Sequence, residues 1–153
     1  MKHIIVAALA LGFLFAAAPA SAAGDISPAD QKMLHDYTLT MDKVKGLDAA
    51  MADCEKAGPA VAEEAKSIGS DSQSLAEMKT KLAAHPTILA IYSKHGLTAD
   101  DAVLMPFVLM SAGIAAQYPD AAKELADQTS PAQIAFMKAH EAELKGLKLG
   151  SGE

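Results

Sequence analysis

Beyond Met1 and His3, the chain contains four histidines and seven methionines, the residues most able to bind a metal ion. Imidazoles and thioethers are ligands that zinc and copper accept. His35 and His140 lie near the two ends of the predicted domain and could meet if its terminal helices pack together. However, no two of the four histidines lie within nine residues of each other, whereas helical zinc motifs place ligands about four residues apart. A periplasmic copper, zinc or haem carrier that uses His35, His140 and methionines is therefore kept as the alternative function.

Cys54 is the only cysteine, so no disulfide can form within the chain. Its thiol could act as a nucleophile, link two copies of the chain, or fill the core. The neighbouring carboxylates of Asp53 and Glu55 disfavour a reactive thiolate. Its place on an apolar stripe with Leu47 and Met51 favours burial. A homodimer joined through Cys54 stays open as the alternative.

The most hydrophobic segment suggests another kind of site, an adaptable apolar pocket. Pro106 lies well inside this segment and removes a backbone hydrogen bond, which favours a kinked helix. Flexible methionines beside a kink can line a cavity for an apolar ligand. The residues predicted to form its wall are Met105, Phe107, Met110 and Ile114. The plainer interpretation of the same side chains is core packing.

The sequence lacks the motifs by which common enzyme classes are recognised. It has no glycine-rich phosphate loop, nucleophile elbow, paired metal-binding histidines or haem-attaching Cys-x-x-Cys-His motif. It has no arginine to clamp a phosphate or carboxylate. The segment after residue 22 carries 12 lysines against 19 acidic residues, a net charge of about −7, which disfavours nucleic acid and anionic lipid. We therefore expect neither an enzyme nor a cofactor.

Residues 1–22 have the pattern of a cleavable signal peptide. A positively charged start precedes an apolar stretch at residues 4–18, and small residues at 20–22 match the signal peptidase site. The apolar stretch is short for a membrane span, and no stop-transfer segment follows it. We predict export to the periplasm and a mature domain at residues 23–153 without a membrane span.

The elements that must position these residues are predicted to be helices. Alanine is very abundant, leucine, methionine, lysine and glutamate supply much of the rest, and no alternating run predicts a strand. We expect one all-α bundle of about five to seven helices, with residues 148–153 fraying. The predicted helices cover residues 27–56, 60–67, 72–84, 86–95, 98–117 and 130–145, with a short helical turn or two at 120–127.

Capping residues predict where two of these helices begin. Thr98 with Asp101, and Ser130 with Gln133, each place a cap and its partner three residues apart. The helix that starts at Thr98 is the most hydrophobic and is expected at the centre of the bundle. Gly46 is a weak point within the first helix and indicates a bend or a close crossing of another segment.

Two segments carry a resemblance to known proteins: Lys94–Gly113 (KHGLTADDAVLMPFVLMSAG) and Ser130–Leu144 (SPAQIAFMKAHEAEL). They resemble stretches of small exported helical proteins of Gram-negative bacteria, a group without an assigned function. The resemblance implies an exported helical bundle and carries over no catalytic residue. We predict a non-catalytic accessory or binding protein of the cell envelope, which engages an apolar small molecule or an envelope protein.

Overall fold

The structure, a computed structural model, describes residues 26–70, 72 and 74–149, and these residues form helices and no strand. The all-α class is confirmed, with nine helices in the described part of the chain rather than five to seven. The predicted signal peptide and residues 150–153 lie outside the described residues. The helices are α1 (Pro28–Asp36), α2 (Met41–Lys56), α3 (Pro59–Ser70), α4 (Leu75–Ala84), α5 (Pro86–Lys94), α6 (Ala99–Gln117), α7 (Pro119–Glu124), α8 (Pro131–Ala139) and α9 (Glu141–Leu144).

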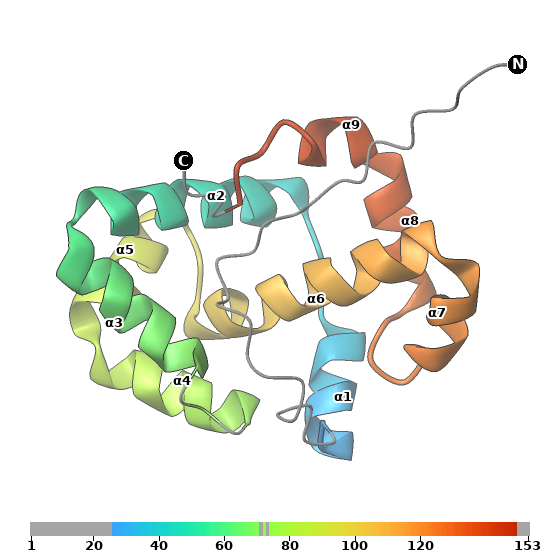
Figure 1. The fold of residues 1–153 in the computed structure, drawn as a ribbon, viewed down its shortest axis with the longest axis horizontal. Coiled ribbons are helices and arrows are strands. Elements are labelled where there is room, and N and C mark those ends of the chain that lie inside the picture. Colours follow the sequence, from blue (N-terminus) through green and yellow to red (C-terminus); the bar gives the residue numbers. More distant parts are fainter. Residues whose placement is uncertain (1–25, 71, 73, 150–153) are drawn as a thin grey trace, which may run out of the picture.

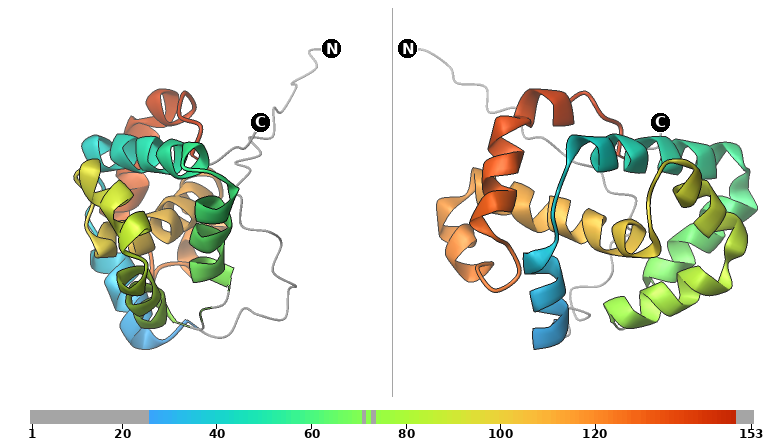
Figure 2. Two further views of the ribbon diagram at one scale, coloured as in Figure 1. Left: turned by 90° about the vertical axis from the view of Figure 1, so that its left-hand side faces the viewer. Right: turned by 180° about the vertical axis from the view of Figure 1, so that it is seen from behind.

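Helix α6 is the centre of the bundle, as its hydrophobic sequence predicted. Helices α1, α2, α4, α5, α7 and α8 all pack against it. Figures 1 and 2 show α3, α4 and α5 grouped at one end of α6, with α7 and α8 at the other. Met105, Val108 and Ala112 in the middle of α6 are completely buried. The core is therefore built around this helix.

Both predicted capping boxes are confirmed. The Thr98 hydroxyl accepts a hydrogen bond from the Asp101 amide at 3.1 Å, and the Asp101 carboxylate accepts one from the Thr98 amide at 2.9 Å. The same reciprocal pair joins Ser130 and Gln133 at the start of α8, at 3.3 and 2.9 Å. Each box satisfies amide groups that a helix start leaves without partners.

The predicted helix at residues 27–56 is wrong, because the chain breaks at residues 37–40. Helix α1 ends at Asp36, and Thr40 caps the start of α2 by accepting a hydrogen bond from the Lys43 amide at 3.3 Å. Leu39, within this link, is buried. Apolar residues continue through the break, so the hydrophobic pattern did not reveal it.

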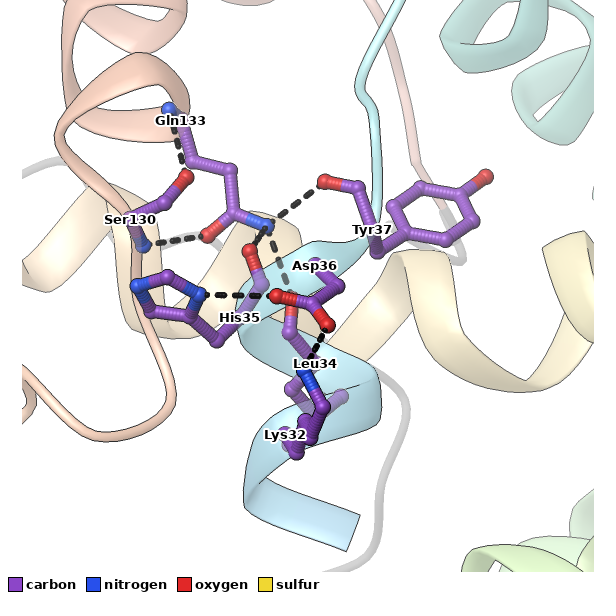
Figure 3. Close-up of polar contacts among 7 residues, drawn as sticks. All are labelled: Lys32, Leu34, His35, Asp36, Tyr37, Ser130 and Gln133. Carbon is purple, nitrogen blue, oxygen red and sulfur yellow. Dashed lines mark hydrogen bonds and ion pairs between the residues drawn. The ribbon is translucent and has the colours of Figure 1, made fainter. Parts of the chain in front are cut away.

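Gln133 of α8 stabilises this break from a distant part of the chain (Figure 3). Its side-chain NH2 group donates to the carbonyl oxygens of Leu34 and Tyr37, both at 2.7 Å, and lies 3.3 Å from that of His35. Gln133 is only 2 % exposed. The last carbonyls of a helix have no partner within it, so this amide caps the end of α1 and favours termination there.

The predicted helix at residues 130–145 is also interrupted. His140 stands between α8 and α9 with backbone angles φ −110° and ψ 16°, outside the regular helical range.

The C-terminal segment was predicted to fray from residue 148, but Lys148 and Leu149 are held against α2. Their backbone amides both donate to the Asp48 carboxylate of α2, at 2.9 and 2.7 Å.

Gly46 marks a close crossing, as predicted. A Cβ atom at this position of α2 would lie 2.8 Å from the carbonyl oxygen of His95, closer than packed atoms approach. The α5–α6 link can therefore run directly against the backbone of α2. At Gly113 of α6, a Cβ atom would meet only the Met137 methyl group, at an ordinary 3.5 Å.

These two glycines give a matched test of the crossing. Alanine is favoured over glycine by about 1 kcal/mol inside a helix, but we expect Gly46→Ala to lower the free energy of unfolding by about 1–3 kcal/mol through overpacking. Gly113→Ala should be neutral or stabilise by up to about 1 kcal/mol. Urea unfolding of both variants measures the difference. Equal effects of the two substitutions would contradict the close crossing.

Candidate functional site

An apolar cavity of about 150 Å³ lies between α2, α3, α4, α5 and α6. Its walls are mainly aliphatic, aromatic and sulfur-containing side chains, among them Met51, Met78 and Phe107. The charged residues that line it are Glu55 and Lys66. The cavity is partly open to solvent, and a concave, mainly apolar space with a few polar groups in its lining is the first candidate for a binding site.

The cavity exists because α3 presents small residues to it. Ala62, Ala65 and Gly69 lie three and four residues apart, which places them on one face of the helix. Helix α3 packs on α2 and α4 and makes at most weak contact with α6. The space left opposite these small residues is bounded on α6 by Pro106 and Phe107.

The titratable side chains in the inner wall are held in their neutral forms. Burial raises the pKa of the Cys54 thiol, and the charges of Asp53 and Glu55 raise it further. Burial also raises the pKa of Tyr92 to about 12, with a smaller effect from Cys54. Cys54 is 5 % exposed, so a disulfide between two copies would require its sulfur to leave the interior. Neither the Cys54 thiol nor the Tyr92 hydroxyl therefore adds charge to the wall at neutral pH.

The structure does not bring the four predicted wall residues together. Phe107 lines the cavity, but Met105 is completely buried elsewhere in the core. Met110 and Ile114 are 46 % and 42 % exposed. Successive residues of a helix point about 100° apart, so Met105 and Phe107 face nearly opposite sides of α6. Flexible methionines do line the cavity, but they are Met51 and Met78, which come from other helices.

The residues that sequence reasoning missed are the small ones of α3. The spacing of Ala62, Ala65 and Gly69 was a readable signal of a face without bulky side chains. What the sequence did not show is which side chains lie opposite this face. That information depends on how α3 is placed against α2, α4 and α6.

The histidines lie apart, each beside a carboxylate. No group of three or more His, Cys, Asp or Glu side chains among the described residues is placed to hold a metal ion. His140 also packs on the Phe136 ring, with 4.7 Å between the centroids. The pairs are His35–Asp36 at 3.1 Å (Figure 3), His85–Glu64 at 2.6 Å, His95–Asp53 at 3.0 Å and His140–Glu143 at 3.1 Å.

A buried carboxylate at Asp101 is the other group that could do chemistry. The Tyr37 hydroxyl and the Lys43 ammonium group lie 2.7 and 2.8 Å from one of its oxygens, and Thr98 donates twice to the other. Burial alone would raise the pKa of Asp101, but Lys43, Thr98 and Tyr37 together hold it well below its usual range. Burial, followed by the hydrogen bond to Asp101, raises the pKa of Tyr37. With both oxygens occupied, Asp101 serves to join α2 and the α1–α2 link to α6.

Within the described part of the chain, α6 is the one helix long and apolar enough to cross a membrane. More than half of its apolar stretch is buried inside the fold, and the core helix of a folded domain has the same composition.

Comparisons with models of protein families, with curated proteins and with solved structures gave no match for this chain. The apolar cavity is thus the feature that bears most directly on function.

Proposed function

We propose that this protein is a non-catalytic binding protein of the periplasm that holds an apolar small molecule in the cavity between α3 and α6. The observation that carries the proposal is the apolar cavity of about 150 Å³. A water molecule occupies about 30 Å³ in the liquid and needs two to four polar partners when buried. An enclosed apolar cavity of about 150 Å³ binds molecules as small as benzene, so a mainly apolar space of this volume is large enough for a small hydrocarbon group.

The lining supports a ligand defined by size and polarity more than by shape. Met51 of α2 and Met78 of α4 lie in the wall, and unbranched thioether side chains adapt to irregular partners. Cys54 and Tyr92 add no charge. Export, the other half of the proposal, is supported by the signal-peptide pattern of residues 1–22.

The expected affinity can be estimated from the free energy of burying the methylene groups of the ligand. Each buried methylene group contributes about 0.8 kcal/mol, so a six-carbon chain gains about 5 kcal/mol at most. Part of this gain is lost to the entropy of immobilisation. A linear alcohol such as 1-hexanol should therefore bind with a Kd of about 1 mM.

Filling the cavity gives the test of this proposal. We expect saturable binding of 1-hexanol to the unmodified protein by calorimetric titration, and at least about tenfold weaker binding to Ala65→Leu, whose added methyl groups occupy the cavity. Ala60→Leu is the matched control, because Ala60 is exposed on the same helix. It should bind like the unmodified protein. Equal affinities for 1-hexanol in Ala65→Leu and Ala60→Leu would rule out this cavity as the site.

A further inference from the structure

We propose that Leu149 is a plug that divides one apolar channel along α6, and that the ligand is a single-chain amphiphile whose chain displaces it. This inference rests on the proposed function and names the class of ligand and the residue that limits its length. Leu149 belongs to the segment after α9, which returns to α2 (Figure 1).

A second cavity, of about 290 Å³, lies between α6 and the helices α8 and α9. Leu109, Gly113 and Met137 form part of its apolar lining. Leu149 lines this cavity as well as the first one. It is 5 % exposed and is the one residue that the linings of the two cavities have in common.

Both cavities lie along the same face of α6. Ala102 and Pro106 line the first, and Leu109, Gly113 and Gln117 line the second. Their spacing of four, three, four and four residues follows one stripe of a helix. At 1.5 Å per residue the stripe is about 22 Å long, enough to accommodate an extended alkyl chain once Leu149 has moved.

Two backbone hydrogen bonds and the burial of the Leu149 side chain hold the plug in place. The amides of Lys148 and Leu149 share one carboxylate oxygen of Asp48, at 2.9 and 2.7 Å. Leu149 has a φ of +32°, a backbone conformation that costs energy in any residue other than glycine. The buried side chain and the Asp48 contacts compensate for this strain. Displacing Leu149 relieves this strain, which offsets part of the cost of exposing the side chain and breaking the two hydrogen bonds, and an alkyl chain that takes its place restores the apolar burial.

The two cavities differ in polarity in the way that an amphiphile requires. Glu55 and Lys66 are the two charged residues among the 18 that line the first cavity, whereas Lys138, Glu141 and Lys145 are three of the ten that line the second, which is therefore the more polar. The chain of the ligand then lies in the first cavity and its polar end at the charged side of the second. Sites for drug-sized ligands begin at about 300 Å³, a volume that the two cavities together exceed.

The test compares 1-hexanol with 1-dodecanol in the unmodified protein and in Leu149→Ala. We expect Leu149→Ala to raise the affinity for 1-dodecanol at least about tenfold and to change that for 1-hexanol by less than about threefold. Asp48→Ala releases the segment without changing a core side chain. Like Leu149→Ala, it should raise the affinity for 1-dodecanol and leave that for 1-hexanol nearly unchanged. Leu147→Ala is the control, because Leu147 is half-buried in the same segment and lines neither cavity. It should leave the affinity for 1-dodecanol unchanged.

Hydrogen exchange of the Leu149 amide gives a second measurement on the unmodified chain. The amide should be protected in the free protein and with 1-hexanol, and should lose protection at saturating 1-dodecanol. If the protein binds 1-hexanol but Leu149→Ala does not raise its affinity for 1-dodecanol, Leu149 is not a plug, and the proposed function is unaffected. A Leu149 amide that stays protected from exchange while 1-dodecanol is bound would also contradict the plug without affecting the proposed function. Absence of 1-hexanol binding would overturn both.

Discussion

Gln133→Ala should lower the free energy of unfolding by about 3 kcal/mol, although Gln133 lies outside the candidate site. The substitution removes the donor of two hydrogen bonds of 2.7 Å to the carbonyls of Leu34 and Tyr37. A buried polar group left without its partner costs about 1–3 kcal/mol. Most domains have a total stability of only about 5–15 kcal/mol. Urea unfolding followed by circular dichroism measures the loss.

Gln133→Glu separates the two roles of this side chain. Glutamate is a preferred residue at the third position of a capping box, so it keeps the hydrogen bond from the Ser130 amide. It has no NH2 group, however, and its oxygens would face the carbonyls of α1. We expect a loss of stability at pH 7 at least as large as that of Gln133→Ala. A Gln133→Glu variant as stable as the unmodified protein would show that the carbonyl contacts do not hold the α1–α2 break.

Asp101→Ala should cost a similar amount, about 3 kcal/mol. It removes the capping box of α6 and leaves the Tyr37 hydroxyl and the Lys43 ammonium group without their shared partner. A lost cap costs about 0.5–2 kcal/mol, and the unpaired hydroxyl of the half-buried Tyr37 adds part of the roughly 1–3 kcal/mol that a fully buried group would cost. Asp100→Ala is the matched control, since Asp100 is exposed and forms an ion pair with Lys79, at 2.8 Å. Exposed ion pairs contribute about 0–1 kcal/mol.

The contribution of Asp101 should also depend on pH in a defined direction. Its pKa in the folded protein lies below the unfolded value of about 3.9. Its stabilising effect is therefore complete above that value and is lost as the pH falls towards the lower folded-state pKa. The stability difference between the unmodified protein and Asp101→Ala should be constant from pH 7 to about pH 5 and shrink below about pH 4. A difference that grew on acidification would contradict the ion pair.

Local signals in the sequence were sufficient for the helix starts and the central helix. The capping boxes at Thr98 and Ser130 depend on residues three positions apart, so they can be read without knowing the fold. The break at residues 37–40 could not be read in this way. It depends on Gln133, which lies 99 positions away from Leu34 in the chain. The sequence indicated only that Gln133 belongs to the capping box of α8, and not that its NH2 group also binds the carbonyls at the end of α1.

The candidate site was only partly visible for a related reason. A cavity is a space between elements, so it depends on tertiary placement and not on one helix. Of the predicted wall residues, Phe107 lines the first cavity, whereas Met105 is buried on the other side of α6. Leu149 lay beyond the last predicted helix, where fraying was the ordinary expectation. Its burial depends on Asp48, a residue of α2.

The most direct test of the central claim follows the methionine methyl groups by NMR during titration with 1-hexanol. Met51 and Met78 line the cavity, whereas Met33 and Met41 do not. We predict saturable shifts of the Met51 and Met78 signals with one common dissociation constant, and no comparable shifts at Met33 and Met41. Unchanged signals from Met51 and Met78, or equal and unsaturable drifts of all four, would contradict a binding site between α3 and α6.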